Sequence, residues 1–262
     1  MKAVILAGGA GTRLMEETAT VPKPMVEIGG MPILWHIMKV YAHFGVDEFV
    51  VLAGYKGHQI RDYFANYYIR NCDVTFDLAN GDQTVHNSIG EPWKVTIVDT
   101  GLETMTGGRL LRARRYLESE RFFLTYGDGV SDVDLSALLA FHTKANVVAT
   151  MTAVKSESRF GHPSIQDGGL VDSFSEKPNI QEDVINAGFF VLEPSIFDYL
   201  GEGDPCILER YPMEALASEG KLAAYQHDGF WKCMDTLRDK VALEAEWQAG
   251  RAPWRLWDGD AE

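Results

Sequence analysis

Short apolar runs alternate with amphipathic segments along the first 155 residues of the chain. The runs are rich in β-branched and aromatic side chains and predict strands at residues 3–7, 48–53, 74–76, 95–98, 122–126 and 147–154. Apolar positions three and four residues apart predict helices at residues 32–43, 58–69, 107–117 and 135–144. This alternation is typical of an α/β fold with a mostly parallel sheet flanked by helices.

The pattern changes after about residue 155, where short strands follow one another without long helices. We expect strands at residues 170–174, 188–192 and 222–225, short helices around Ile196 and at residues 213–218, and a last helix that starts near Thr236. No linker composition separates the two parts, so we expect a single domain over residues 1–262, with halves at about 1–155 and 156–262. The tail from Arg251 to Glu262 combines a proline, tryptophans and acidic residues, which favours a loosely held end.

Composition narrows the class of protein. The chain has 262 residues, of which 46% are hydrophobic and 24% charged, as in ordinary globular proteins. Its formal net charge of −14 argues against nucleic-acid binding and against docking on an anionic membrane. The three cysteines lie far apart, and neither they nor the seven histidines show a metal-binding spacing. Because the first apolar run is also too short for a membrane span, we expect a cytoplasmic protein with reduced thiols.

The first predicted strand runs into a glycine-rich turn, Leu6-Ala7-Gly8-Gly9-Ala10-Gly11-Thr12-Arg13-Leu14. Glycines allow a backbone to approach a phosphate closely, and their N–H groups can surround an anion. The spacing does not match a P-loop, because no lysine follows Arg13. It does not match a dinucleotide-binding turn either, because Leu14 stands where the third glycine is required. A tight turn without a ligand is the alternative.

Three further charged positions are candidates for chemistry. Lys23 lies between two prolines that stiffen its backbone, and its ammonium suits a phosphate, although a solvated loop lysine is the alternative. Asp128 follows a predicted buried strand and lies between two glycines, where a carboxylate can meet a hard cation such as Mg²⁺. Turn or N-cap roles are the alternatives for Asp128 and for Asp235, which directly precedes Thr236 and the last helix.

The segment Gly8–Leu14, followed by Pro22–Met25, closely resembles the signature of the sugar-nucleotide pyrophosphorylases, which are nucleotidylyltransferases acting on sugar 1-phosphates. Other segments resemble that family in the expected order: Val26–Gly30 with Pro32, Tyr126–Gly129, Ser175–Pro178, Asn186–Phe190 and Trp231–Thr236. The resemblance implies the nucleotide-diphospho-sugar transferase fold, a Rossmann-like, mixed but mainly parallel β-sheet flanked by helices. Its first half would bind the nucleotide, and its smaller second portion the sugar.

Segments further along look like the cytidylyl-transferring branch of the family: Glu91–Trp93, Val98–Gly101 and Met105–Leu110. The chain lacks the glutamine-rich segment with Gly-Leu-Ala that thymidylyl and uridylyl relatives usually carry in that region. The resemblance therefore implies transfer of a cytidylyl group from CTP to α-D-glucose 1-phosphate, giving CDP-glucose and pyrophosphate, with Mg²⁺ as cofactor. It also implies a homo-oligomer and a product that feeds dideoxyhexoses of lipopolysaccharide O-antigen. A thymidylyl- or uridylyltransferase and a catalytically silent binding subunit are the alternatives.

The resemblance also assigns site residues. Arg13, Lys23 and Asp128 are the expected catalytic residues, and Asp128 and Asp235 the expected metal ligands. The expected substrate-binding residues are Leu6, Ala7, Gly8, Gly9, Ala10, Gly11, Thr12, Arg13, Lys23, Thr104, Arg109, Gly127, Glu176, Lys177, Asn186 and Gly188. Together with Mg²⁺, the cations in this set would form a local positive site within an acidic protein.

Some of these residues have a structural role as the alternative to substrate binding. Arg109 could be a surface arginine in the first turn of a helix, and Glu176 and Lys177 could form a surface turn. Tyr126, Phe189 and Trp231 are expected to pack rather than to contact substrate. Four tryptophans fit either a subunit interface or the core: Trp93, Trp247, Trp254 and Trp257.

Overall fold

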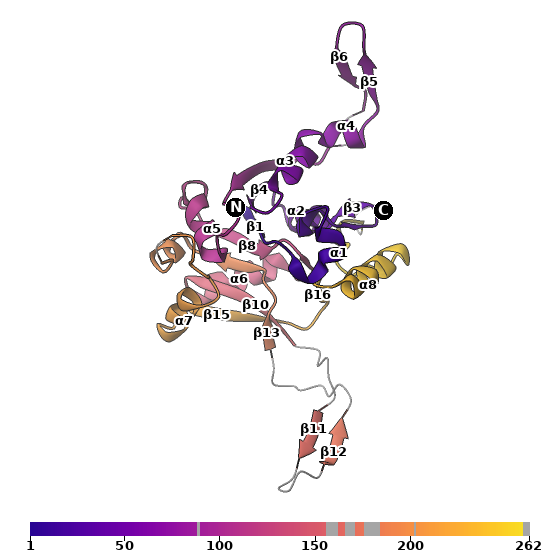
Figure 1. The fold of residues 1–262 in the computed structure, drawn as a ribbon. Coiled ribbons are helices and arrows are strands. Elements are labelled where there is room, and N and C mark those ends of the chain that lie inside the picture. Colours follow the sequence, from indigo (N-terminus) through magenta and orange to yellow (C-terminus); the bar gives the residue numbers. More distant parts are fainter. Residues whose placement is uncertain (88–89, 156–161, 166–170, 176–183, 202, 259–262) are drawn as a thin grey trace.

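The computed structural model describes residues 1–87, 90–155, 162–165, 171–175, 184–201 and 203–258. Most of the described strands form one sheet with the order β13-β10-β14-β8-β1-β4-β7, and β15 pairs with β10 (Figure 1). The strands of this sheet are β1 (Ala3–Ala7), β4 (Glu48–Ala53), β7 (Lys94–Asp99), β8 (Phe122–Tyr126), β10 (Ala149–Lys155), β13 (Val184–Asn186), β14 (Phe190–Leu192) and β15 (Leu222–His227).

The sheet is mixed, which confirms the predicted fold class. Neighbours are parallel along β8-β1-β4-β7 and in the pair of β10 with β15. By contrast, β14 runs antiparallel to both β8 and β10, and β13 runs antiparallel to β10. The parallel part is the region that carries the glycine-rich turn, because this turn directly follows β1.

Helices cover both faces of the sheet (Figure 1). The α-helices of the described residues are α1 (Met15–Thr18), α2 (Ile33–His43), α3 (Gly57–Ala65), α4 (Tyr67–Asn71), α5 (Thr106–Ala113), α6 (Leu135–Ala145), α7 (Tyr211–Ser218) and α8 (Leu237–Gln248). Of these, α4 lies away from the sheet, next to a projecting hairpin (Figure 1). Short 3₁₀ helices occupy residues 12–14, 23–25, 114–116, 194–198 and 256–258. No helix in the described part of the chain is long and apolar enough to cross a membrane.

Side chains of β1 alternate between two buried apolar clusters. Ala3, Ile5 and Ala7 belong to the cluster that includes residues of α2, α6 and α8. Val4 and Leu6 belong to the cluster that includes residues of α5 and α7. A strand with both faces buried produces the continuous apolar run seen in the sequence. The fold is therefore a three-layer α/β/α arrangement with β1 at its centre.

Smaller strand pairs lie outside the central sheet. Two hairpins project from the body, β5 (Val74–Asp77) with β6 (Asp82–Val85) and β11 (His162–Ile165) with β12 (Val171–Ser175) (Figure 1). The other pairs are β2 (Glu27–Ile28) with β3 (Met31–Pro32) and β9 (Gly129–Ser131) with β16 (Trp231–Cys233). The pair β9–β16 matters most for function, because both candidate metal ligands flank it. Asp128 directly precedes β9, and Asp235 follows the end of β16 by two residues.

The predicted strands at residues 3–7, 48–53 and 122–126 are confirmed residue for residue. The helix predicted over residues 58–69 breaks at Asn66, which separates α3 from α4. The strand β6 was not predicted, because all four of its residues are exposed and it lacks an apolar run.

The expectation of a loosely held tail was wrong for the described residues up to 258. Trp254 is 1% exposed and stacks near Phe230 and Trp247. Its indole N–H donates to Nδ1 of His36, a buried side chain whose pKa is lowered to about 4 because burial disfavours the charged ring. The apolar area of one tryptophan outweighs the polar composition around it. Trp254 therefore belongs to the core rather than to a subunit interface.

Candidate active site

A cavity of about 570 Å³ lies at the carboxyl ends of β1 and β8. This is the edge where ligands bind in open α/β sheets. Among the residues assigned from sequence, its lining includes Leu6, Ala7, Gly8, Gly9, Gly11, Thr12, Arg13, Lys23, Thr104, Arg109, Gly127, Asp128, Asn186 and Asp235. The structure thus brings together residues that are distributed over most of the sequence.

Hydrogen bonds from Thr18 and Tyr55 hold the glycine-rich turn after β1. Gly11 has a φ of 62°, a left-handed conformation that glycine adopts without steric cost. The hydroxyl of Thr18 donates to the carbonyls of Gly11 and Leu14, at 3.0 and 2.9 Å. The carbonyl of Gly8 accepts from the N–H of Tyr55 at 3.1 Å. These bonds fix the loop from both sides while it lines the cavity.

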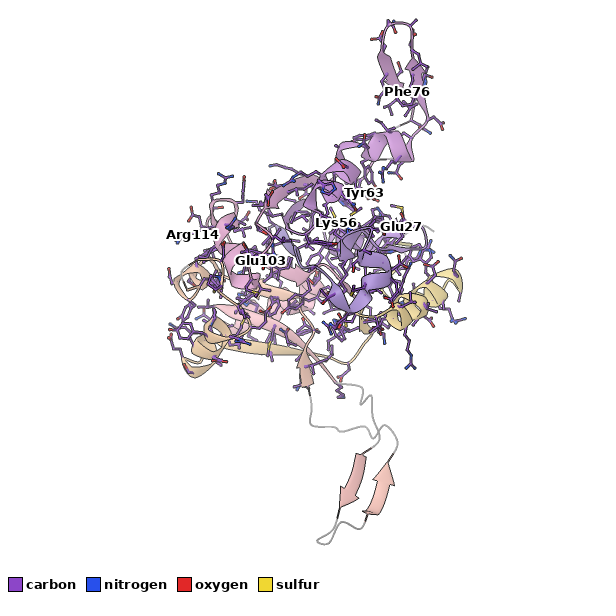
Figure 2. All side chains as sticks on the ribbon, in the orientation of Figure 1. Glu27, Lys56, Tyr63, Phe76, Glu103 and Arg114 are labelled. Atoms are coloured by element: carbon purple, nitrogen blue, oxygen red, sulfur yellow. The ribbon has the colours of Figure 1, made fainter. Side chains whose placement is uncertain are left out.

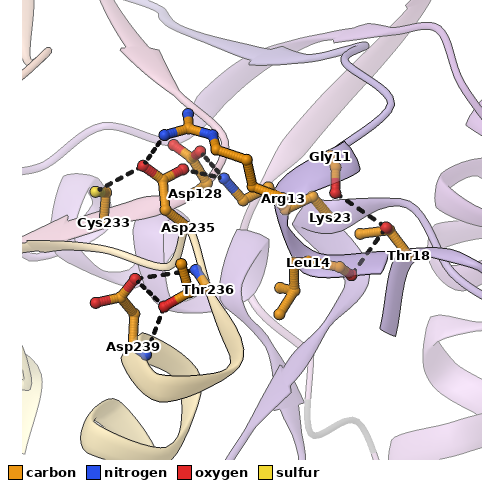
Figure 3. A network of polar contacts seen from close by, with 10 residues as sticks. All are labelled: Gly11, Arg13, Leu14, Thr18, Lys23, Asp128, Cys233, Asp235, Thr236 and Asp239. Atoms are coloured by element: carbon orange, nitrogen blue, oxygen red, sulfur yellow. Dashed lines mark hydrogen bonds and ion pairs between the residues drawn. The ribbon is translucent and has the colours of Figure 1, made fainter. Parts of the chain in front are cut away.

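Lys23 joins the two candidate metal ligands. Its ammonium donates to Asp128 Oδ2 at 2.5 Å and to Asp235 Oδ1 at 2.7 Å (Figure 3). Arg13 contacts the other oxygen of Asp235 at 2.8 Å. Lys23 is 9% exposed, whereas the side chain of Arg13 is 72% exposed. One cation of the cluster is therefore fixed, and the other can turn toward a ligand.

Pairing between β9 and β16 brings the two aspartates together. Gly129 is the register partner of Cys233, and the N–H of Met234 donates to the carbonyl of Asp128 at 2.8 Å. Asp235 is not the N-cap of α8, because Thr236 fills that role in a capping box with Asp239. The carboxylate of Asp235 thereby remains available to face Lys23, and the N-cap alternative for this residue is wrong.

The charges of the cluster shift each other's pKa values. Burial alone would lower the pKa of Lys23, but the charge of Asp128, followed by hydrogen bonds to both aspartates, raises it. Burial raises and Lys23 lowers the pKa of Asp235, with a net decrease. The thiol of Cys233 lies 3.6 Å from Asp235, and burial together with that carboxylate raises its pKa to about 12. The cluster therefore holds a protonated lysine, an ionised Asp235 and an uncharged thiol at neutral pH.

The donor set of Asp128 and Asp235 fits a magnesium ion. Both carboxylates reach one nitrogen atom, so both can also reach one small cation. Mg²⁺ is usually bound by one or two carboxylates together with phosphate oxygens and water. In the described part of the chain, no group of three or more His, Cys, Asp or Glu side chains could hold a metal ion. The remaining ligands would therefore come from a phosphate and from water.

Arg109 lies in the wall of the cavity and is 5% exposed. Its Nη1 donates to the hydroxyl of Thr100 at 2.6 Å and to the carbonyl of Gly101 at 2.8 Å. Its Nη2 donates to the carbonyl of Gly8 at 3.1 Å and to that of Leu102 at 3.3 Å. The alternative of a surface arginine is therefore wrong. Arg109 carries a buried positive charge and ties α5 to the glycine-rich turn.

A few assigned residues lie elsewhere. Ala10 and Gly188 belong to segments at the cavity but are not part of its lining. Gly188 instead packs so tightly against the ring of Tyr126 that a Cβ atom would approach Cδ2 to 2.9 Å. Glu176 and Lys177 lie outside the described residues.

Sequence reasoning missed part of the lining: Pro24, Met105, Thr106, Thr125, Tyr126, Gly129, Ala187, Trp231 and Cys233. Phe189 packs in the core as expected, but Tyr126 and Trp231 also face the cavity. Tyr126 is the last residue of β8, and the carboxyl end of a strand in such a sheet was a signal for it. Cys233 is the last residue of β16 and stands two positions before Asp235.

The nucleotidyl transferase family model matches residues 2–236. The chain therefore belongs to the nucleotidyl transferase family. It is 53% identical to a glucose-1-phosphate cytidylyltransferase of Salmonella typhi, over 98% of this chain and 100% of that protein. It is 43% identical to a probable glucose-1-phosphate cytidylyltransferase of Bacillus subtilis, with the same coverage.

Solved structures agree on the fold. A UDP-glucose pyrophosphorylase complexed with UDP-glucose superposes with a TM-score of 0.65 at 18% identity, over 95% of this chain and 99% of that one. HddC from Yersinia pseudotuberculosis superposes with a TM-score of 0.67 at 24% identity, over 94% of this chain and 99% of that one.

Proposed function

We propose that this protein transfers the cytidylyl group of CTP to α-D-glucose 1-phosphate and releases pyrophosphate. The observation that carries the proposal is the 53% identity with a glucose-1-phosphate cytidylyltransferase over the full length of that protein. The cavity supports it, because the lysine, arginine and two aspartates needed for this chemistry meet at one place. A silent binding subunit would be expected to lack at least one of these charges.

In the reaction, an oxygen of the sugar phosphate attacks the α-phosphorus of CTP, and pyrophosphate leaves. Phosphoryl transfer leaves the protein mainly the tasks of positioning and charge stabilisation. The glycine-rich turn offers backbone N–H groups to the phosphates. Lys23 holds a fixed positive charge at the cavity, and the exposed Arg13 can follow the charge that develops on the leaving group. Arg109 holds the turn in place through its hydrogen bond to the carbonyl of Gly8.

Asp128 and Asp235 would hold the magnesium ion. When bound, this ion supplies a counter-charge for the phosphate oxygens and restricts their orientation. The two carboxylates also keep Lys23 protonated and directed into the cavity. The net charge of −14 makes this local arrangement necessary, because the remainder of the protein repels a polyanionic substrate.

The direct test is pyrophosphate release by the full chain with Mg²⁺ and glucose 1-phosphate, with CTP, UTP or dTTP supplied at equal concentration. We expect kcat/KM for CTP to exceed the others by at least about tenfold, a difference of ~1.4 kcal/mol. Chelation of Mg²⁺ should abolish release. Comparable use of UTP or dTTP would contradict the nucleotide assignment. Absence of release from a folded protein that binds CTP would identify a silent binding subunit.

We also propose that the protein is a homo-oligomer. The hairpin β5–β6 projects from the body and carries Phe76 (Figure 2). Its apolar residues Phe76 and Leu78 are 53% and 92% exposed. An isolated two-stranded hairpin is marginally stable in water, so a second copy that covers these side chains would stabilise it. Light scattering on the wild type and on the double variant Phe76→Ser, Leu78→Ser tests this, and equal masses at the monomer value would contradict it. The cytoplasmic location stays a prediction.

A further inference from the structure

A chain of hydrogen bonds runs along the cavity wall, from Glu209 through Tyr126 to Asn186. The hydroxyl of Tyr126 donates to Glu209 Oε1 at 2.6 Å, and Nδ2 of Asn186 donates to the hydroxyl oxygen of Tyr126 at 3.2 Å. Tyr126 and Asn186 line the cavity, whereas Glu209, in the turn before α7, does not. The charged side chains of the Lys23 cluster take no part in these hydrogen bonds.

The direction of every hydrogen bond in the chain is fixed. A carboxylate has no proton, so Glu209 can only accept, and Tyr126 must donate to it. The oxygen of Tyr126 is then left as an acceptor, and of the two polar atoms of the Asn186 amide the nitrogen is the one that can donate to it. The N–H of Gly188 donates to Oδ1 of Asn186 at 2.9 Å, and it fixes the same orientation of the amide independently. Among the described residues, the second N–H of Asn186 has no protein acceptor, and Asn186 lines the cavity.

Glu209 is itself anchored on its second oxygen. The hydroxyl of Thr106, in the first turn of α5, donates to Glu209 Oε2 at 2.6 Å. The N–H of Leu208 donates to that hydroxyl at 2.9 Å, so Thr106 cannot turn away without the loss of two bonds. Glu209 thus joins the start of α5 to the end of β8, and through Tyr126 it reaches β13. One residue of each of these three elements, Thr106, Tyr126 and Asn186, lines the cavity.

We infer that Glu209 and Tyr126 are positioning residues that hold the Asn186 amide as a hydrogen-bond donor toward the sugar hydroxyls of the substrate. The inference rests on the proposed function, and it names the part of the substrate that this wall controls. The oxygen atoms of a sugar can accept the remaining N–H of Asn186. Neither Glu209 nor Tyr126 needs to touch the sugar. Their removal should therefore weaken recognition of the sugar portion alone.

The test compares two ligands of which one carries the sugar, CDP-glucose, and the other lacks it, CDP, each titrated calorimetrically into the full chain with Mg²⁺. The additional phosphate charge of CDP is the same for every variant, so each variant is compared with the wild type on the same ligand. In Tyr126→Phe, the ring stays and only the hydroxyl is lost. We expect its Kd for CDP-glucose to rise about 3- to 10-fold, the effect of one hydrogen bond. Its Kd for CDP should stay within twofold of the wild-type value. In turnover, KM for glucose 1-phosphate should rise and KM for CTP should not.

A second variant, Glu209→Gln, separates positioning from charge. The glutamine can still accept from Tyr126 through Oε1 and direct its amide nitrogen to Thr106, so we expect nearly wild-type binding. Glu209→Ala should reproduce the defect of Tyr126→Phe. In the background of Asn186→Ala, Tyr126→Phe should cause no further loss, because both act through the same amide. An undiminished effect in that background would overturn the inference.

Tyr199→Phe is the matched control. The hydroxyl of Tyr199 donates to Glu219 Oε2 at 2.7 Å in the same chemical arrangement, but neither residue lines this cavity. It should bind both ligands as the wild type does. If Tyr126→Phe weakens CDP and CDP-glucose equally, or weakens neither, the inference is wrong while the proposed function stands. If the wild type binds neither ligand, both the inference and the proposed function are wrong.

Discussion

Among the described residues, the buried cations Lys23 and Arg109 line the candidate active site, and they are held in different ways. Lys23 is paired with the carboxylates of Asp128 and Asp235. Arg109 contacts four uncharged oxygens: one hydroxyl and three backbone carbonyls. The partners of Lys23 are the groups a metal ion would use, whereas the partners of Arg109 are one threonine hydroxyl and three backbone carbonyls.

This difference indicates which of the two cations, Lys23 or Arg109, takes part in the reaction. Carboxylates bind a metal or a phosphate-bound metal as well as an ammonium, so the groups that hold Lys23 in place can also take part in the reaction. Backbone carbonyls cannot leave Arg109 without unfolding the turn that presents them. Lys23 should therefore control the rate, and Arg109 should control the stability of the glycine-rich turn. Substitutions of Lys23, Gly8 and Arg109 test this division.

The largest effect is expected for Lys23→Met, which keeps an apolar stem and removes the charge. We expect kcat/KM to fall about 10²- to 10³-fold, comparable to the loss of one oxyanion-hole donor. Pyrophosphate release with CTP and glucose 1-phosphate measures it. Lys94→Met is the control, because Lys94 forms an exposed ion pair with Glu48 away from the cavity. A value for Lys23→Met within threefold of wild type would remove Lys23 from the reaction.

Gly8→Ala tests the backbone side of the comparison. A Cβ atom at Gly8 would lie 2.1 Å from Nη1 of Arg109, a contact that forces the guanidinium away from its carbonyls. We expect a loss of unfolding free energy of about 2–3 kcal/mol, the cost of buried polar groups left without partners. Thermal unfolding measures it, at roughly 2–4 °C per kcal/mol for a chain of this size. Gly9→Ala is the matched control, since a Cβ there meets no atom within 4 Å. Equal melting temperatures for the two variants would show that Arg109 adapts freely.

The sequence predicted the residues of the Lys23 cluster but not their contacts. Lys23, Asp128 and Asp235 were candidates because of local signals: flanking prolines, a strand end between glycines, and a family motif. Their contacts join residues 105 and 212 positions apart, through the pairing of β9 with β16. No short window of sequence specifies a pairing over that distance, because each strand has only three residues and lacks a strong pattern.

The fold was predictable where burial imposes a period, and not elsewhere. β1, β4 and β8 lie inside the sheet, so their sequences are continuous apolar runs with clear ends. Glu209 has no such pattern, since its role depends on Thr106 and Tyr126, which lie 103 and 83 positions away. For the same reason the sequence left two alternatives for Trp254, a subunit interface or the core, and the structure shows the core. Its binding surface is formed by other segments and cannot be seen in the tail itself.

The smallest effect is expected for Arg109→Lys, which keeps the charge and removes the planar set of donors. An ammonium has three N–H groups on one atom. It cannot reach the oxygen of Gly8 and those of residues 100–102 at once, as the two Nη atoms do. We expect a loss of about 1–2 kcal/mol of unfolding free energy, because at least one buried carbonyl is left without a donor.

Arg112→Lys is the matched control for this last substitution. Arg112 lies on the same helix and donates to both carboxylate oxygens of Asp204, at 2.9 and 2.6 Å, but it is exposed. Surface ion pairs contribute about 0–1 kcal/mol, so the melting temperature of Arg112→Lys should stay closer to that of the wild type. If both variants melt together while only Arg109→Lys loses activity, Arg109 acts on the substrate rather than on the turn. The contrast with Lys23 would then fail, because both buried cations would serve the reaction directly.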